Sequence, residues 1–206
     1  MPRDGTQTRT KILDTAEAMI LDQGYSATSI DKVIDAVGVT KGTFFYHFEN
    51  KAALARTLVD RYAAADLSMQ REFRARAEKL ARDPVQRVLV FIGLYEEMME
   101  GLTDPYPGCL FASYLYEANL FDDGIMAVIE DTYLDWRREL GAMLDAAAAA
   151  HPPKLPVDTA DLADMFTAII EGAFIMSKTL KEPKLVAAQL GLYRDFVELL
   201  FGGERG

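Results

Sequence analysis

Apolar side chains recur every three or four positions along most of this chain, which is the spacing of one face of an α-helix. Glycine, proline and polar residues that can cap a helix separate the periodic segments, so we predict one helix in each segment. The predicted helices run from Thr6 or Thr8 to Gly24, from about Ser29 to Val37, from Thr40 to Phe48, from Lys51 to about Arg82, from Pro84 to about Gly101, within 109–121, from Ile125 to Pro152, over 159–181 and over 185–201.

The stretch from Thr28 to Lys51 has the pattern of two short helices joined by a tight turn. Thr28 is followed three residues later by Asp31, which is typical of a helix start. Gly38 can adopt the left-handed conformation that ends a helix, and Thr40 can cap the next one. This arrangement predicts a DNA-binding helix-turn-helix.

The second of these helices has one face for the protein core and one for another molecule. Phe44 and Phe48 are four residues apart and share the core face. A glycine inside so short a helix costs roughly 1 kcal/mol relative to alanine, which is understandable if DNA must approach the backbone closely. Asn50 can cap the following helix, whose first residue, Lys51, suits a phosphate. The outward and flanking positions are Gly42, Thr43, Phe45, Tyr46 and His47.

The run GVTKGTFFYHFENKAAL, with the amphipathic helix that ends at Gly24 before it, resembles the N-terminal domain of the TetR family of transcriptional regulators. The resemblance implies an all-α homodimeric repressor. Its helix-turn-helix domain would span residues 1–50, a connector helix would span 51–82, and a larger ligand-binding and dimerisation domain would span 83–206. A small molecule bound by the larger domain would loosen the grip on a pseudo-palindromic operator in double-stranded DNA.

The family pattern also implies roles for individual residues. Phe45 stands where the family usually has a tyrosine that meets the DNA backbone, and Ile34 replaces a customary alanine. Outside this context, His47 would be a structural histidine. The residues implied to lie on the DNA are Thr40, Lys41, Gly42, Thr43, Tyr46 and His47, with Thr28 and Lys51 on phosphates.

The net charge of the chain is −10, which is unusual for a protein that binds DNA. Residues 1–51 carry six basic and seven acidic side chains, whereas the rest of the chain carries 16 basic and 25 acidic ones. Acidic groups more than a Debye length of about 8 Å from the DNA are largely screened by salt. The acidic C-terminal part therefore does not exclude DNA binding.

The last two predicted helices carry apolar residues on more than one face, so each needs burial on two sides. One side can pack into the domain core and the other against a second copy of the chain. We therefore predict a symmetric homodimer with a four-helix interface, whose DNA-reading heads lie about 34–36 Å apart. The residues expected at this interface are Phe166, Ile170, Phe174, Leu192, Phe196 and Leu199.

The C-terminal part is rich in aromatic and methionine side chains, which suit a mainly apolar effector pocket. Core packing explains any one of them equally well, so the pocket is implied by the family resemblance. Glu117 could attract a cation or accept a hydrogen bond. Cys109, at a predicted helix N-terminus, could sense electrophiles or oxidants, or be a small core residue. The pocket candidates are Tyr95, Met98, Met99, Cys109, Tyr114, Tyr116, Glu117, Met126, Tyr133, Trp136 and Met165.

The remaining features argue against other functions. With two histidines, one cysteine and no glycine-rich phosphate-binding motif, the chain offers no catalytic triad, metal site or cofactor site, and we predict no enzyme activity. Residues 122–124 are expected to form a turn without the ligands of a calcium loop. A helical protein-interaction scaffold is the alternative class, although it would not need Gly42, Thr43 and Tyr46 on an outward face.

The sequence also suggests where the protein acts. A single cysteine excludes an intrachain disulfide, which fits a reducing compartment. The polar start MPRDGTQTRTK is not followed by an apolar run, and no stretch approaches 18 uninterrupted apolar residues. We expect a cytoplasmic protein with no membrane partner.

Overall fold

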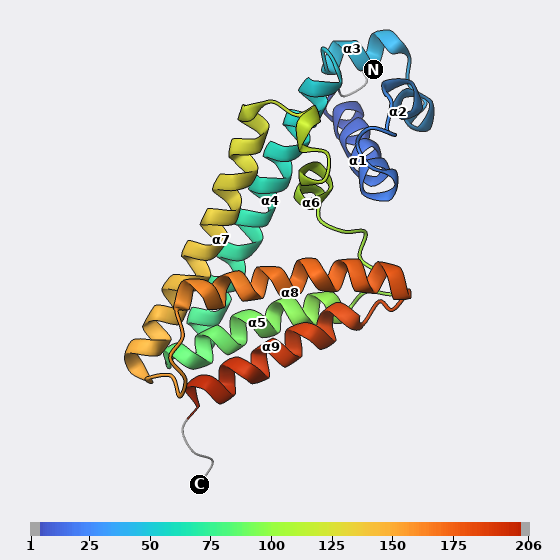
Figure 1. Cartoon of the computed structure of the whole chain (residues 1–206). Helices are drawn as coiled ribbons and strands as arrows, with labels where there is room; N and C mark the ends of the chain where they lie inside the picture. Colours follow the sequence, from blue (N-terminus) through green and yellow to red (C-terminus); the bar gives the residue numbers. More distant parts are fainter. Residues whose placement is uncertain (1–4, 203–206) are drawn as a thin grey trace. The chain divides into compact units, whose positions relative to one another are not determined.

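The computed structural model describes residues 5–202, and all regular structure within this range is helical (Figure 1). Residues 1–4 of the predicted N-terminal domain and 203–206 of the predicted C-terminal domain lie outside the described range. The all-α fold is confirmed. The helices are α1 (Gly5–Gln23), α2 (Ile30–Val37), α3 (Lys41–His47), α4 (Lys51–Leu80), α5 (Pro84–Glu100), α6 (Leu110–Leu115), the 3-10 helix η1 (Ala118–Leu120), α7 (Asp123–Ala150), α8 (Thr159–Leu180) and α9 (Leu185–Phe201).

The helices form two compact units, of which the first contains residues 5–65 and 107–130 and the second contains 66–106 and 131–202. Helices α4 and α7 each contribute residues to both units. The predicted domain boundary differs, because it assigns 107–130 to the C-terminal domain. The structure groups this segment with the N-terminal helices, since the ring centroids of Tyr114 and Phe121 lie 5.7 and 4.5 Å from that of Tyr25.

The core of the first unit is built from one apolar stripe on each of its helices. Ile12 of α1, Phe44 of α3 and Leu58 of α4 are fully buried, and Val33 of α2 is 1% exposed. Burying a side chain of this size contributes about 1.5–3 kcal/mol, so these stripes hold the short helices α2 and α3 in place. The predicted core role of Phe44 and Phe48 is confirmed, since Phe48 is 3% exposed.

In the second unit, α5 runs beside α8 and α9 (Figure 1). Val88 and Ile92 of α5 and Leu190 of α9 are fully buried in this packing. The hydroxyl of Tyr193 donates a 2.7 Å hydrogen bond to the carbonyl of Leu162, which ties α9 to α8. The second unit thus has its own core.

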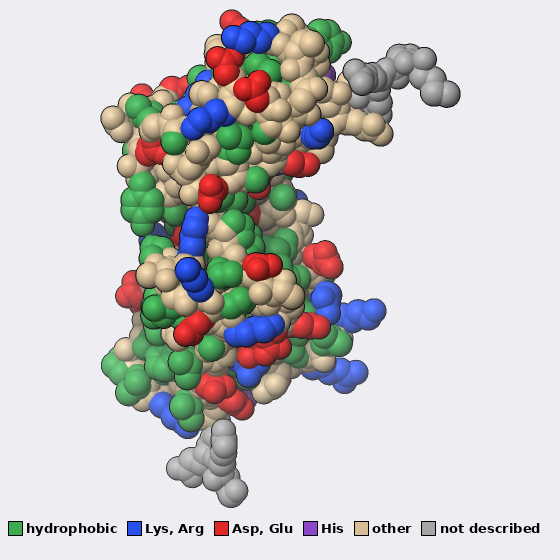
Figure 2. All heavy atoms as spheres, turned by 90° about the vertical axis from the view of Figure 1, so that its right-hand side faces the viewer, with side chains coloured by type: hydrophobic (Ala, Val, Ile, Leu, Met, Phe, Trp, Pro, Cys, Tyr) green, Lys and Arg blue, Asp and Glu red, His purple; other side chains and the backbone are tan. Residues whose placement is uncertain are grey.

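Helices α8 and α9 also leave large apolar side chains uncovered, and hydrophobic side chains gather on the second unit in Figure 2. Two of the six predicted interface residues, Phe166 and Phe174, are each only 7% exposed and belong to the core of their own chain. Leu192 and Leu199 are each 62% exposed, and Ile170 and Phe196 are half-buried. Further uncovered apolar residues on these helices are Met165, Ile175, Met176 and Leu180.

The segment 109–121 differs from the single buried helix predicted for it. Helix α6 stops at Leu115, and residues 118–120 form η1. Leu110, Phe111 and Tyr114 are buried, whereas Leu115, Tyr116 and Leu120 are exposed. The helix breaks before Glu117, whose carboxylate binds elsewhere in the first unit.

Residues 122–124 are not the turn predicted for them. Asp122 Oδ1 accepts a 2.9 Å hydrogen bond from the backbone N–H of Ile125, so this aspartate caps the first turn of α7. Among the helices of residues 5–202, none is both long enough and apolar enough to cross a membrane.

Candidate nucleic-acid interface

Caps mark where α2 and α3 begin and where α2 ends. Ser29 caps α2 by accepting a 3.2 Å hydrogen bond from the N–H of Lys32, and Thr40 caps α3 by accepting a 3.1 Å bond from the N–H of Thr43. Gly38 has φ 75° and ψ 39°, the left-handed conformation that ends α2. The cap of α2 is therefore Ser29, one residue after the predicted Thr28.

Helix α3 has the two faces that its sequence predicts. Phe44 is fully buried and Phe48 is 3% exposed, whereas Tyr46 is 83% exposed and Phe45 is 49% exposed. Because the buried phenylalanines hold the helix to the core, the opposite face is presented to solvent. The other predicted DNA residues of this segment are the exposed Thr40, Lys41 and Gly42 and the half-buried Thr43 and His47.

The predicted DNA contact Lys41 already has an acidic partner. Its ammonium lies 2.9 Å from a carboxylate oxygen of Asp31 on α2, and both side chains are exposed. The hydrogen bond that Lys41 donates to Asp31 is the main cause that raises the pKa of Lys41. A phosphate would therefore have to replace Asp31 as the partner of Lys41.

Thr28 is placed differently from its predicted role on a phosphate. Its side chain is only 2% exposed, and its hydroxyl donates a 2.9 Å hydrogen bond to the carbonyl of Gly24. This bond closes the turn between α1 and α2. Thr28 therefore supports the interface from inside the first unit.

Lys51 is also turned into the protein. Its Nζ donates a 2.6 Å hydrogen bond to the carbonyl of Tyr25 and lies 3.9 Å from the centroid of the Tyr25 ring. Burial lowers the pKa of Lys51, and the nearby charge of Glu117 opposes this effect. Asn50 caps α4 as predicted, with its Oδ1 accepting a 2.8 Å bond from Ala53 N. Lys51, predicted to lie on a phosphate, therefore has internal partners in this structure.

Tyr25 is the centre of a cluster that we call the Tyr25 anchor, formed by Tyr25, Lys51, Tyr114, Glu117 and Phe121. Glu117 Oε1 accepts a 2.7 Å hydrogen bond from the N–H of Tyr25. The rings of Tyr114 and Phe121 are stacked with a centroid distance of 4.3 Å, and Phe121 also packs on Tyr25. The anchor thus joins the turn after α1 to both α4 and the α6–η1 segment.

Sequence reasoning did not identify Tyr25 as a functional residue. The neighbouring Gly24 could have indicated a tightly packed turn at this point. Gly24 has φ 88°, which L-residues with side chains rarely adopt, and a Cβ there would lie 3.0 Å from Glu117 Oε1. Glu117 Oε2 also accepts a 3.0 Å bond from Ser26 N. Glu117, a predicted pocket residue, is therefore occupied with binding backbone amides of the first unit.

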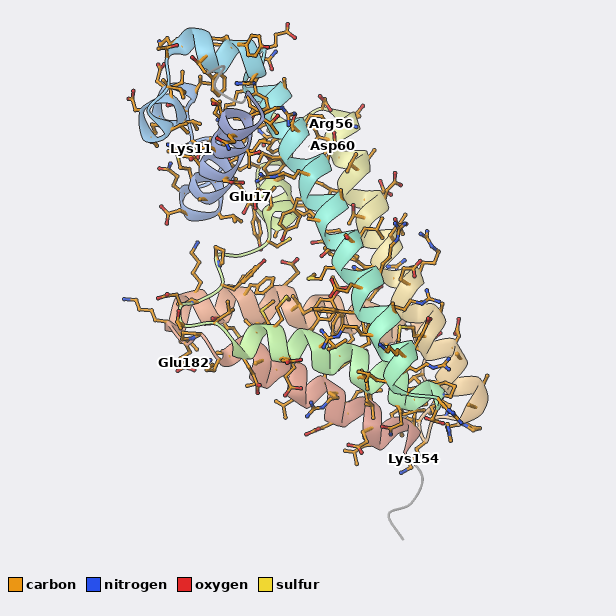
Figure 3. The ribbon with its side chains drawn as sticks, turned by 180° about the vertical axis from the view of Figure 1, so that it is seen from behind. Lys11, Glu17, Arg56, Asp60, Lys154 and Glu182 are labelled. Atoms are coloured by element: carbon orange, nitrogen blue, oxygen red, sulfur yellow. The ribbon has the colours of Figure 1, made fainter. Side chains whose placement is uncertain are left out.

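Ion pairs and hydrogen bonds brace α1 against its neighbours. Lys11, labelled in Figure 3, donates a 2.9 Å bond to the carbonyl of Val37, the last residue of α2. Arg61 of α4 binds Asp14 at 2.6 Å and Glu17 at 2.5 Å. These contacts tie α1 to α2 and to α4.

The other predicted pocket residues fall into both units. In the first unit, Cys109 and Tyr114 are buried and Met126 is half-buried. Tyr116 is 78% exposed, which does not fit a pocket wall. Because Cys109 is only 5% exposed, the thiol-sensing alternative gains no support. In the second unit, Tyr95 and Met99 are buried, Tyr133 and Trp136 are half-buried, and Met98 and Met165 are partly exposed.

Asp66 of α4 is hydrogen-bonded to Trp136, one of the second-unit candidates, but was not singled out from the sequence. Its Oδ2 accepts hydrogen bonds from Trp136 Nε1 and from Gln70 Nε2, the latter at 2.9 Å. Burial raises the pKa of Asp66, and these two hydrogen bonds oppose the rise. Burial, together with the charge of Asp66, also raises the pKa of Tyr95. A hollow of about 10 Å³, roughly the room for one water molecule, lies beside Gln70 and Phe91.

Two family models match this chain. The model of the bacterial regulatory proteins of the tetR family matches residues 12–58, which include α2 and α3. The model of the tetracyclin repressor-like C-terminal domain matches residues 84–190, more than half of the chain.

The chain belongs to the TetR family. Among its relatives, the HTH-type transcriptional repressor DhaR of Mycobacterium sp. (strain GP1) is 21% identical over 173 residues, which cover 84% of this chain and 83% of DhaR. The transcriptional regulator AcuR of Cereibacter sphaeroides is 26% identical over 161 residues, covering 77% of this chain and 71% of AcuR.

Solved structures show the same fold in other TetR proteins. The regulator from Agrobacterium tumefaciens superposes with a TM-score of 0.76 at 22% identity, covering 97% of this chain and 100% of that one. As a member of the TetR family, the protein is a DNA-binding transcriptional regulator. The interaction-scaffold alternative is therefore not favoured.

Proposed function

We propose that this TetR-family protein is a homodimeric repressor that leaves a pseudo-palindromic operator when a small effector binds in its second unit. The observation that carries the proposal is the exposed outer face of α3, held on the fully buried Phe44 inside the segment that matches the family's DNA-binding model. This face presents the hydroxyl groups of Thr40 and Thr43, the backbone at Gly42, which has no side chain, and the ring of Tyr46.

The proposed DNA contacts follow from exposure. Tyr46, at 83%, is more exposed than Phe45 beside it. Gly42 has no side chain and leaves room for the backbone of the duplex. Phe45, which lacks a hydroxyl, offers an apolar contact of the kind that suits a thymine methyl group. Lys41 would exchange Asp31 for a phosphate on binding. Thr28 and Lys51 would support DNA binding indirectly, by holding the turn after α1. The proposed contact set is Thr40, Lys41, Gly42, Thr43, Phe45, Tyr46 and His47.

The homodimer is supported by the uncovered apolar residues of α8 and α9. Leu192 and Leu199 lie seven positions apart on α9, two turns of the helix, and are equally exposed. Two copies of such a face can pack on each other around a twofold axis and remove these side chains from water. The proposed interface comprises Ile170, Ile175, Met176, Leu192, Phe196 and Leu199.

The effector is proposed to act through helices that contribute to both units. Helix α4 supplies Lys51 to the Tyr25 anchor of the first unit and Asp66 to the hydrogen bond with Trp136 in the second unit. A ligand that favours one arrangement of α4 would change the support of the DNA-reading helices. Operator and effector must then oppose each other by the same factor, typically about 1–3 kcal/mol of coupling free energy.

Two further points complete the proposal. The protein would act in the cytoplasm, because its proposed partner, the operator DNA, lies there. Its relatives are transcriptional regulators, and we propose that this chain likewise regulates transcription without catalysing a reaction.

A gel-shift experiment with the DNA that flanks the protein's own gene tests the proposed function. We expect the purified wild-type protein to shift one fragment, and Tyr46→Ala to lose this shift while remaining a dimer in size-exclusion chromatography with light scattering. The matched control is Tyr116→Ala, another exposed tyrosine of the first unit, which should bind as the wild type does. Operator affinity unchanged in Tyr46→Ala would reject the proposed contact face.

A further inference from the structure

In the second unit, the carboxylate of Asp66 has neutral hydrogen-bond donors as partners. Asp66 Oδ2 accepts hydrogen bonds from the indole N–H of Trp136 and the side-chain amide of Gln70. Burial dominates the rise in the pKa of this carboxyl, and no basic side chain is among the causes. The side chain is nevertheless only half-buried, so another molecule can reach it.

The rings of Trp136 and Tyr133 connect Asp66 to a second carboxylate, that of Glu171. The ring centroids of Trp136 and Tyr133 are 4.5 Å apart, with the planes inclined at 48°. The hydroxyl of Tyr133 donates a 3.3 Å hydrogen bond to Glu171 Oε1. Asp66, Trp136, Tyr133 and Glu171, which we call the acidic–aromatic row, thus link α4, α7 and α8 within the second unit.

Three arginines on these elements in the second unit bind carboxylates other than Asp66 and Glu171. One of them is Arg138 of α7, which pairs with Asp135 at 2.6 Å. Arg74 of α4 lies 2.6 Å from Glu139, and Arg137 of α7 lies 2.6 Å from Asp164. Arg74, Arg137 and Arg138 therefore have acidic partners outside the row.

This arrangement suits a positively charged ligand. An opposite charge beside a partly desolvated carboxylate stabilises its ionised form, and the faces of tryptophan and tyrosine attract cations as well. An anion would meet the carboxylates of Asp66 and Glu171, which repel it. An uncharged ligand would make use of the rings but not of the charges.

We propose that the effector is an organic cation, an amine or quaternary ammonium with an apolar body, whose charged nitrogen lies beside Asp66 and the rings of Trp136 and Tyr133. This inference rests on the proposed function, because it names the class of effector for that regulator. The apolar body would lie against aromatic residues of the same unit. Tyr95 packs on Phe73, Phe91 and Phe166 with centroid distances of 4.9, 5.3 and 5.4 Å.

Trp136 is the only tryptophan of the chain, so its fluorescence reports on the row directly. The probes are phenethylamine and benzyltrimethylammonium, with the uncharged 2-phenylethanol as the comparison of similar size. We expect both cations to change the Trp136 emission saturably, with affinities at least about tenfold higher than that of 2-phenylethanol. Equal affinities for the alcohol and the cations, or no saturable change with any cation, would overturn the inference.

Asp66→Asn tests the charge alone, since the asparagine oxygen can still accept the indole hydrogen bond. We expect this variant to bind the cations about tenfold more weakly or worse, with little change for 2-phenylethanol. Asp66→Glu keeps the charge and should retain most of the affinity. The control is Glu198→Gln, which removes a charge from an exposed position of α9 in the same unit and should leave cation binding unchanged. Wild-type affinity in a folded Asp66→Asn would overturn the inference.

Operator binding is measured separately from these titrations. A wild type that shifts DNA but shows no preference for cations refutes the cationic effector and leaves the repressor proposal intact. If the cations bind and Asp66→Asn weakens their binding, but the wild type shifts no DNA, the repressor proposal is refuted and the cation site stands. If Asp66→Asn does not fold, as judged by circular dichroism, the comparison of charged and uncharged probes on the wild type decides alone.

Discussion

Glu117 and Tyr25 are joined by a 2.7 Å hydrogen bond across 92 positions of the chain. The carboxylate also reaches Ser26 N, so it binds the two amides that follow the left-handed Gly24. Lys51 binds the Tyr25 carbonyl from the other side. The turn that leads into the DNA-reading helices is thus held by a carboxylate and an ammonium on two other elements of the first unit.

Replacing Glu117 by glutamine should loosen this turn. The amide keeps one oxygen acceptor but loses the charge and the second acceptor, and hydrogen bonds to charged groups contribute about 1.5–3 kcal/mol each before allowing for solvent exposure. We expect Glu117→Gln to lower the free energy of unfolding by about 1 kcal/mol, measured by urea denaturation. Operator affinity should fall as well.

The control for this change is Glu130→Gln, an exposed glutamate of the same unit. Equal unfolding curves for Glu117→Gln and the wild type would show that the anchor contributes nothing to stability.

The salt dependence of operator binding separates Lys41 from Lys51. A direct phosphate contact contributes about one unit to the slope of log affinity against log salt concentration for each protomer. We expect Lys41→Ala to reduce the slope, because Lys41 is exposed beside the duplex face. Lys51→Ala should weaken binding at every salt concentration with little change of slope, because Lys51 holds the Tyr25 carbonyl. A slope reduced equally by both variants would place Lys51 on a phosphate instead.

Dimerisation is expected to depend on α9. Leu199→Glu puts a charge on each copy at the proposed twofold interface, where two uncompensated carboxylates would have to be desolvated. We expect this variant to be monomeric in light scattering at concentrations where the wild type is a dimer, and to lose operator binding.

Leu155→Glu serves as the comparison for Leu199→Glu, since Leu155 is similarly exposed in the same unit but lies outside α8 and α9. A dimeric Leu199→Glu protein, or a monomeric Leu155→Glu protein, would contradict the assignment of the interface.

Much of the fold could be predicted because helix formation depends on neighbours in the sequence. The apolar periodicity gave helix boundaries close to those of α5 and α9, and the spacing of Phe44 and Phe48 gave the orientation of α3. The apolar residues of α8 and α9 were harder to assign. Both faces are apolar, so spacing alone could not tell that Phe166 and Phe174 face their own core while Leu192 and Leu199 do not.

The sequence by itself determined that the chain is helical, where α5 and α9 begin and end, and which residues of α3 face outward, because each follows from contacts within a few positions. Only the tertiary structure decided that Thr28 and Lys51 turn inward, that Glu117 binds the turn after α1, and that Asp66 meets Trp136. These polar groups are satisfied by partners on other elements or across a turn. Which donor meets which acceptor is settled only when the helices pack.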